Sequence, residues 1–442
     1  MKNFRKTAIF MLLAVSGFYA CEEGERFGIS SDDSTPPTAP VFDSVQPLSG
    51  GARLFYRIPS DEDLISIEAS YMAANGKLIK SAASFMAPYL EVYGLPDSLE
   101  HTIQLYALDR AGNQSEPVNV RVKPLEPAYL RVAKILTVKP AFGALLVEWK
   151  NELQQDITVF VDFTFPFNGA QRSMSQVYSS RDSTEHQFIK GLNLSEQEAV
   201  SVKVTVEDLY GNRSETVDKG ALHLFTDSEL DKSKFVLLNP GDTIGGVRMG
   251  YGDSFQGKIE YIIDDKIDYL TGYGNWDGVV ANYACWGIYT VMIDGANVNP
   301  QKNWNILIDL GDKYELSRII THQAWTNSPR TNMNPTDRGY YYGEWNVGIY
   351  NMYWWDGNDA ATVGEWKLIQ QVKIPMPSAD MGVMDIIRQA IAGDEALMYP
   401  DDPDYTPATR YFRYQCVNGF QNNYNGTAEV LAELTLYGKK AP

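Results

Sequence analysis

The sequence has few of the residues on which common active sites are built. It contains 4 His and 3 Cys in 442 residues. It has no His-Glu-x-x-His, Gly-x-Ser-x-Gly or Cys-x-x-Cys motif and no complete P-loop signature. A glycosidase needs only two carboxylates, which 56 acidic residues do not exclude. We predict a protein that is not an enzyme, because the β-modules described below leave no segment large enough for a catalytic domain.

Long apolar runs and positive charge are also scarce. The apolar stretch from Ala8 to Ala20 is shorter than the roughly 20 residues that a membrane-spanning helix needs. The net charge is −18 and the isoelectric point is about 4.7, which argues against nucleic acid and anionic lipid as partners. No cofactor is required by any motif.

The N-terminus has the pattern of an export signal. Lys2, Arg5 and Lys6 precede the apolar stretch, and Ala20 precedes Cys21. Residues 1–20 therefore predict a signal peptide, and Cys21 is the predicted lipidation site. The alternative is an ordinary secretory signal with an incidental cysteine.

The residues around Cys21 resemble those of a known lipoprotein class. Phe18-Tyr-Ala-Cys21 resembles a lipobox, and Glu22, Glu23 and Glu25 resemble the export signal of Bacteroidetes surface lipoproteins. The resemblance implies a lipid anchor on the cell surface, in the outer membrane, with residues 21–37 as an acylated acidic tether. Residues 30–40 are rich in Ser, Asp and Pro, so the stretch also fits a solvated linker.

A repeat organises the first half of the chain. The segment Leu105–Val118 recurs as Val204–Val217, with Asp109 matching Asp208 at an offset of 99 residues. This period predicts two copies of one module, at 38–125 and 126–225, of the size of an immunoglobulin-like sandwich. Alternating segments such as 102–108 and 200–206 predict strands.

The Asp-x-x-Gly-Asn-x-Ser-Glu segment of each copy resembles the last hairpin of fibronectin-type-III-like modules in such lipoproteins. Trp149 lies where these modules place a core Trp. The resemblance implies tandem immunoglobulin/fibronectin-III-like sandwiches that act as spacers. We interpret Asp109 and Asp208 as turn residues that fix strand register. A metal or ligand site is the alternative interpretation.

Residues 226–442 differ in composition from the first half of the chain and hold eight of the nine Trp residues. Four anchors resemble a discoidin-like domain (coagulation factor 5/8 type C, galactose-binding-like): Trp304 before Ile306–Gly311, Trp366, Arg410–Arg413 and Ala432–Gly438. The implied fold is a jelly-roll β-sandwich, so the whole chain is predicted to be all-β. Its predicted strands include 259–264, 303–311 and 316–322. Near 378–407 the chain carries an insertion. It contains a predicted helix with Met384, Ile387 and Ile391 on one face and Gly393 at its end. An acidic run from Asp394 to Asp404 follows, which we interpret as a solvated loop, with a calcium site as the alternative.

The discoidin-like resemblance also implies where a ligand binds. Sugars are bound by aromatic rings and planar polar groups, which such domains present on loops at one end. Two loops fit, 325–342 and 418–425. The candidate carbohydrate-binding residues are Trp325, Arg330, Arg338, Tyr342, Phe420, Asn422 and Tyr424. A structural calcium ion is common in this family, and Asp264 or Asp277 with Glu433 would hold it.

Other residues are assigned to the core. Core packing is predicted for four aromatic residues in or beside apolar strands, Trp304, Trp366, Trp286 and Tyr350. His322 closes a strand and is interpreted as an edge histidine with its hydrogen bonds satisfied. Cys285 and Cys416 could pair in an oxidising compartment or remain as two buried thiols.

Together these observations predict a cell-surface accessory lipoprotein of a polysaccharide-utilisation system that binds glycan without catalysis. The implied partners are a TonB-dependent transporter and its glycan-binding lid lipoprotein. The alternative is a structural or adhesive surface protein that assembles with other proteins.

Overall fold

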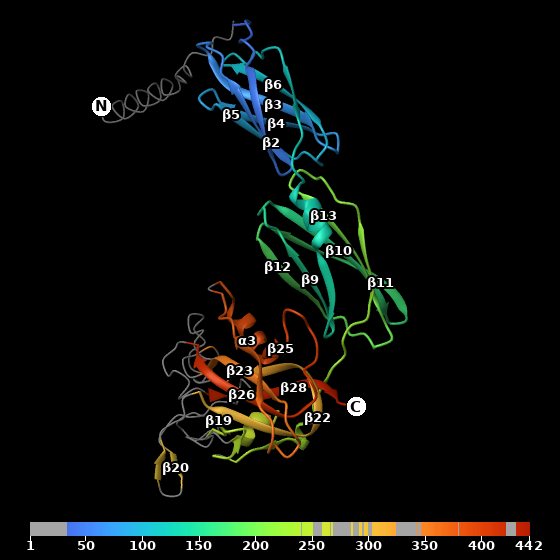
Figure 1. The fold of residues 1–442 in the computed structure, drawn as a ribbon, viewed down its shortest axis with the longest axis vertical. Coiled ribbons are helices and arrows are strands. Elements are labelled where there is room, and N and C mark those ends of the chain that lie inside the picture. Colours follow the sequence, from blue (N-terminus) through green and yellow to red (C-terminus); the bar gives the residue numbers. More distant parts are fainter. Residues whose placement is uncertain are drawn as a thin grey trace, which may run out of the picture. The chain divides into compact units, whose positions relative to one another are not determined.

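The computed structural model describes residues 33–442 except 240, 251–258, 266, 268–283, 286–290, 294–295, 299–302, 324–341, 343–345, 379 and 421–429. Strands dominate the described chain, and the prediction of an all-β protein is confirmed (Figure 1). Within these residues, no helix is both long and apolar enough to cross a membrane.

The first module consists of two antiparallel sheets with one apolar core. Their orders are β1-β2-β5 and β4-β3-β6-β7. Leu54, Ile67 and Leu105, from three different strands, are fully buried, because each sheet turns one face inward. The strands are β1 (Val41–Leu48), β2 (Gly51–Arg57), β3 (Leu64–Met72), β4 (Leu78–Ser84), β5 (Tyr89–Tyr93), β6 (His101–Asp109) and β7 (Val118–Val122).

The second module repeats this strand order, as β12-β9-β8 and β11-β10-β13-β14. The predicted core residue Trp149 is 2% exposed in β9. The sequence did not predict helix α2 (Ala128–Ile135), because eight residues are too few to establish a helical period. The strands are β8 (Thr137–Ala141), β9 (Ala144–Lys150), β10 (Ile157–Phe167), β11 (Ala170–Ser180), β12 (Thr184–Lys190), β13 (Val200–Asp208) and β14 (Val217–Leu222).

The repeated turn has the same hydrogen bonds in both copies. Asp109 Oδ1 accepts from Asn113 N at 2.8 Å, and Oδ2 accepts from Asn113 Nδ2 at 2.9 Å. Asp208 makes the same pair of contacts with Asn212, at 2.9 and 2.8 Å. The glycine before each Asn has a positive φ, 89° in the first copy and 84° in the second, which explains why glycine is required there. These contacts confirm the interpretation of Asp109 and Asp208 as turn residues.

The C-terminal region is built around one long strand, β22 (Asn305–His322). Its first part pairs with β26 (Thr409–Gly419) and its second part with β28 (Glu433–Lys440). The register shifts between Asp309 and Tyr314, around Gly311 at φ 79°. We expected two strands, at 303–311 and 316–322. The chain forms a single bent strand, because glycine absorbs the change of direction without breaking the ladder.

The main C-terminal sheet has the order β15-β28-β22-β26-β23-β24, with β16 and β25 also paired to β22. The additional strands are β15 (Ser228–Glu229), β16 (Val236–Leu237), β17 (Thr243–Ile244), β18 (Val247–Arg248), β19 (Ala284–Cys285), β20 (Val291–Ile293), β21 (Ala296–Val298), β23 (Val347–Trp355), β24 (Trp366–Lys373), β25 (Asp394–Leu397) and β27 (Val430–Leu431). The discoidin-like jelly-roll assignment remains a prediction.

The chain divides into two compact units, the first comprising Met1–Val138, Val147–Gln187 and Ser201–Ala221, and the second Lys139–Leu146, Phe188–Val200 and Leu222–Pro442.

The aromatic core of this region agrees with the predicted roles. Trp304 and Tyr350 are fully buried, and Cys416 is buried with them. Trp366 is partly buried, packs edge-on against Trp355 at 5.3 Å, and donates from Nε1 to Ile244 O at 2.9 Å. Trp286 lies outside the described residues. Core packing is therefore confirmed for the described members of this set.

Two local predictions were wrong in detail. Residues 259–264 were expected to be extended, but Ile259–Ile263 is a 3-10 helix. Helix α3 (Val383–Ala392) forms and ends at Gly393, and it buries Ile387 as predicted. The residues buried with it are Ile386 and Ala390 rather than Met384 and Ile391. Its Met384 and Ile391 are 59% and 40% exposed.

The acidic run after α3 is not simply a solvated loop. Asp394 and Glu395 begin β25, which pairs with the second part of β22. Glu395 Oε1 accepts from Arg318 Nη1 at 2.8 Å. A charged partner on the neighbouring strand draws this part of the run into the sheet.

Candidate functional site

The structure describes two of the seven predicted carbohydrate-binding residues. Trp325, Arg330, Arg338, Asn422 and Tyr424 lie outside the described residues.

Tyr342 and Phe420, the two that are described, contact each other. Their rings meet edge-on, with centroids 5.2 Å apart. Tyr342 is fully buried and Phe420 is partly buried against the same apolar cluster. Burial raises the pKa of the Tyr342 hydroxyl well above its ordinary value. Tyr342 is therefore a core residue, and its predicted role as a sugar contact was wrong, because no ring face is left for a ligand.

The predicted calcium ligands are only partly described. Asp277 lies outside the described residues, whereas Asp264 and Glu433 are close enough for the charge of Asp264 to raise the pKa of Glu433. Glu433 is 1% exposed and receives a hydrogen bond from Lys232 Nζ. A lysine therefore contacts the carboxylate that was expected to hold a cation.

The sequence did not predict a row of side-chain amides across four neighbouring strands. Gln371 of β24 lies opposite Asn351 of β23, which lies opposite Gln415 of β26, which lies opposite Asn305 of β22. Gln371 Nε2 donates to Asn351 Oδ1 at 3.0 Å, and Asn351 Nδ2 donates to Gln415 Oε1 at 2.9 Å. We call these four residues the amide row.

A tyrosine and an arginine flank the amide row. Tyr353 and Arg413 lie opposite each other on β23 and β26, and the Arg413 guanidinium lies 4.1 Å from the Tyr353 ring centre. Tyr353 Oη donates to Gln415 Oε1 at 3.0 Å, and Arg413 Nε donates to Asn305 Oδ1 at 2.8 Å. Burial lowers the pKa of Arg413 from its ordinary value, although the group stays charged at neutral pH. The two side chains hold the amides in fixed orientations.

Exposure changes along the amide row. Gln371 is exposed, Asn351 and Gln415 are half-buried, and Asn305 is 2% exposed. In the described part of the chain, Gln371 Oε1 and Gln415 Nε2 have no hydrogen-bond partner, so an acceptor and a donor remain for a ligand. The row can bind polar groups, but it contains no nucleophile and no acid–base pair.

The sequence carried only half of the signal for this site. Asn351 and Gln415 are amides within the segments 347–355 and 409–419, which are rich in the aromatic residues that favour strands. The sequence does not say that these two strands are neighbours, or that the register aligns the amides. Strand order and register required the tertiary structure.

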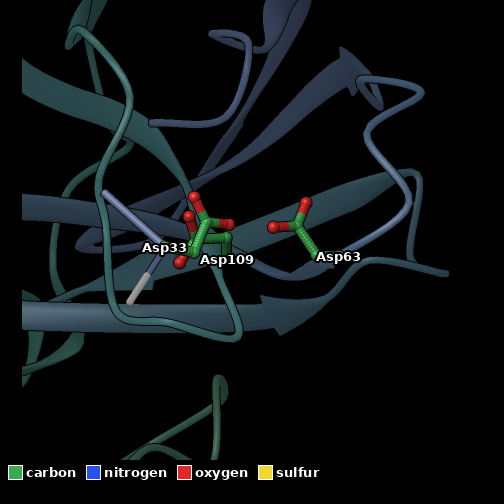
Figure 2. A group of neighbouring side chains, drawn as sticks. All are labelled: Asp33, Asp63 and Asp109. Atoms are coloured by element: carbon green, nitrogen blue, oxygen red, sulfur yellow. The ribbon is translucent and has the colours of Figure 1, made fainter. Parts of the chain in front are cut away.

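A second group of polar side chains occurs in the first module. Figure 2 shows the carboxylates of Asp33 and Asp109 close together, with Asp63 facing them. One oxygen of each lies within 4.8 Å of the others. Asp109 already accepts both turn hydrogen bonds from Asn113, and Asn113 Nδ2 also donates to Asp33 O at 3.0 Å. The hydrogen bonds account for the position of Asp109 without an ion.

The fold thus defines an all-β protein with two repeated sandwich modules and a larger C-terminal β-region. Three family models match the sequence, each described as a domain of unknown function. They are DUF4959 at residues 37–124, DUF5126 at 125–233 and DUF5000 at 276–438. No curated protein is significantly similar to the chain.

Several solved structures resemble the chain at low similarity. SusE-like protein BT2857 is 18% identical over 71% of this chain and 100% of its own, with a TM-score of 0.34. A putative chitobiase fragment from Bacteroides thetaiotaomicron is 14% identical over 49% and 95%, with a TM-score of 0.27. A two-domain fibronectin type III segment from chicken tenascin is 15% identical over 42% and 99%, with a TM-score of 0.21. At these TM-scores the likenesses carry no argument about function.

Proposed function

We propose that this chain is a cell-surface accessory lipoprotein of a polysaccharide uptake system, and that its C-terminal domain binds a glycan without catalysis. The amide row beside Tyr353 and Arg413 is the observation that carries the proposal. Cys21 would attach the chain to the outer membrane, and the two repeated modules would hold the C-terminal domain away from it. A transporter and its glycan-binding lid would be the protein partners.

The chemistry of the amide row suits a neutral sugar. Each amide carries two N–H donors and one oxygen acceptor, which matches hydroxyl groups that both donate and accept. Tyr353 adds an aromatic ring, the usual partner for the apolar face of a sugar. The net charge of −18 disfavours polyanionic glycans, because the chain would repel them.

The row is also prepared for binding. Hydrogen bonds between Gln371, Asn351 and Gln415 fix the amide planes before a ligand arrives. Less side-chain entropy is then lost on binding. Gln415 lies on β26, three residues before Asn418, where the predicted binding segment 418–425 begins. The amide row and this segment are therefore neighbours along the chain.

The test uses the full chain with Cys21→Ala, made without the signal peptide and probed on an array of neutral and acidic glycans. The strongest glycan is then titrated against Asn351→Ala, Trp325→Ala and the unsubstituted chain. Gln176→Ala is the matched control, because this amide is exposed on β11 of the second module. We expect Asn351→Ala to weaken binding about tenfold, the loss of one or two hydrogen bonds, and the control to bind normally.

Two outcomes would contradict the proposal at different levels. If no glycan binds the unsubstituted chain, the proposed function is wrong. If a glycan binds and Asn351→Ala leaves its affinity unchanged, the amide row is structural and binding belongs to the loops that contain Trp325. Melting temperatures of all variants separate lost binding from lost folding.

A further inference from the structure

The expected calcium site of the C-terminal domain contains a lysine side chain. Lys232 lies in a 3-10 turn (Lys232–Lys234) that follows β15, and its side chain is 7% exposed. Its Nζ lies 2.5 Å from Glu433 Oε1, 2.5 Å from Asp265 Oδ1 and 2.8 Å from Thr435 Oγ1. An ammonium has three N–H donors, and these three oxygens use all of them.

The oxygens around Lys232 form a set that would otherwise suit a hard cation. Calcium prefers carboxylate and other oxygen ligands at about 2.3–2.6 Å. Here the ammonium occupies that position, bonded to the same Glu433 that was expected to bind the ion. A divalent cation cannot share these oxygens with Lys232, because it would clash with the ammonium and be repelled by its charge. Among the residues that the structure describes, the oxygens bonded to Lys232 therefore do not fit a calcium ion.

Burial makes a positive charge necessary at this position. A carboxylate as deeply buried as Glu433 is unstable without a charged partner. Burial raises the pKa of Glu433, as do the nearby carboxylates Asp264 and Asp265, whereas the Lys232 ammonium lowers it. Burial alone would lower the pKa of Lys232, but Glu433 and Asp265 raise it above its ordinary value. The pKa of Lys232 is therefore raised and its charge is kept, whereas the pKa of Glu433 stays raised, to about 8, because burial outweighs the ammonium. The positive charge of Lys232 offsets part of the cost of burying this carboxylate.

The contact also joins the two ends of the domain. Lys232 follows β15, which pairs with the last strand, β28, through Ser228 and Glu229. Leu230 N donates to Leu436 O at 2.9 Å beside it. Glu433 and Thr435 lie on β28 itself. A cation at this position holds the entry segment of the domain against its last strand.

We propose that the Lys232 ammonium is the built-in structural cation of the C-terminal domain, and that this domain folds without calcium. The lysine performs the structural task of a bound ion but cannot be removed by a chelator. Stability of the domain would then be independent of the calcium concentration outside the cell.

The test follows thermal unfolding of the full chain lacking its signal peptide, in EDTA, in calcium chloride and in ethylammonium chloride. We expect the unsubstituted protein to melt at the same temperature in all three. Lys232→Ala should melt about 10 °C lower in EDTA, since a buried carboxylate loses its partner. Calcium or ethylammonium should restore part of this loss by entering the vacated space.

Lys234→Ala is the matched control, because Lys234 lies on the same turn and its side chain is 56% exposed. It should melt normally and respond to neither cation. If Lys232→Ala does not fold, Lys232→Arg, which keeps the charge, and calorimetric titration of the unsubstituted chain with calcium still decide the question.

Three results would overturn the proposal. The first is a melting temperature of the unsubstituted protein that falls in EDTA and recovers in calcium, or calorimetric calcium binding that depends on Glu433. The second is a Lys232→Ala variant as stable as the Lys234→Ala control. The third is a loss of stability in Lys232→Ala that neither cation restores.

Discussion

Replacing Asp208 by alanine tests how much the repeated turn stabilises the second module. Asp208 Oδ1 accepts from Tyr210 N and Asn212 N, each at 2.9 Å, and Oδ2 accepts from Asn212 Nδ2 at 2.8 Å. Hydrogen bonds to a charged group contribute about 1.5–3 kcal/mol each when well shielded from water. Because Asp208 is only half-buried, we expect the three together to contribute about 3 kcal/mol to the free energy of unfolding.

Asn212 makes the loss larger than that of an isolated turn. Its Nδ2 also donates to Gly94 O at 3.0 Å, and the residue is 3% exposed. Without Asp208, this buried amide keeps one acceptor instead of two. The stability of Asp208→Asn should lie between that of Asp208→Ala and that of the unsubstituted chain. The asparagine keeps one acceptor oxygen, but its NH2 group would face the side-chain amide of Asn212.

The measurement uses residues 38–225, in which Trp149 is the only tryptophan. Trp149 is 2% exposed, so its fluorescence reports unfolding of the second module. Denaturant titration gives the free energy of unfolding for each variant. Asp162→Ala is the control, because Asp162 is an exposed acid on β10 of the same module and should cost less than about 0.5 kcal/mol. A loss of stability in Asp208→Ala no larger than that in Asp162→Ala would refute the structural role of the turn.

Three further changes have defined outcomes. Ile387→Ala should destabilise the C-terminal domain by about 2–4 kcal/mol and Met384→Ala by less than about 0.5 kcal/mol, measured by denaturant titration, because only Ile387 is buried. The reverse order would mean that α3 packs on its other face. Burial, and to a smaller extent the charge of Lys232, lower the pKa of His322 below 6.5. The domain should therefore lose stability as the pH falls below 6.5, because the unfolded chain binds the proton more tightly. If the free energy of unfolding of His322→Gln falls equally with pH, this residue is not the cause. Cys21→Ala should move the protein from the membrane fraction to the medium, and full protection of the unsubstituted chain from external protease would refute surface exposure.

The features of the fold that were predicted correctly are local ones. The offset of 99 residues between Asp109 and Asp208 predicted the repeated turn, because a tight turn needs a glycine at positive φ and a capping carboxylate at set spacings. The core role of Trp304 followed from an apolar run around it. Such signals lie within a few residues, so they are readable without knowing the partners of a strand.

Helix α3 shows the limit of local sequence patterns. Its presence and its end at Gly393 followed from periodicity and a glycine stop. Its buried face did not, because Met384 and Ile391 are as apolar as Ile386 and Ile387 and only the position of the sheet selects between them.

The sequence by itself determined that the chain is all-β and that its first half is a repeat. The tertiary structure decided that Gln371, Asn351 and Gln415 form one row, that Tyr342 is buried, and that Lys232 meets Glu433 from about 200 residues away. Hydrogen-bonded register and long-range ion pairs depend on which segments the whole fold brings together, and no local pattern records that choice.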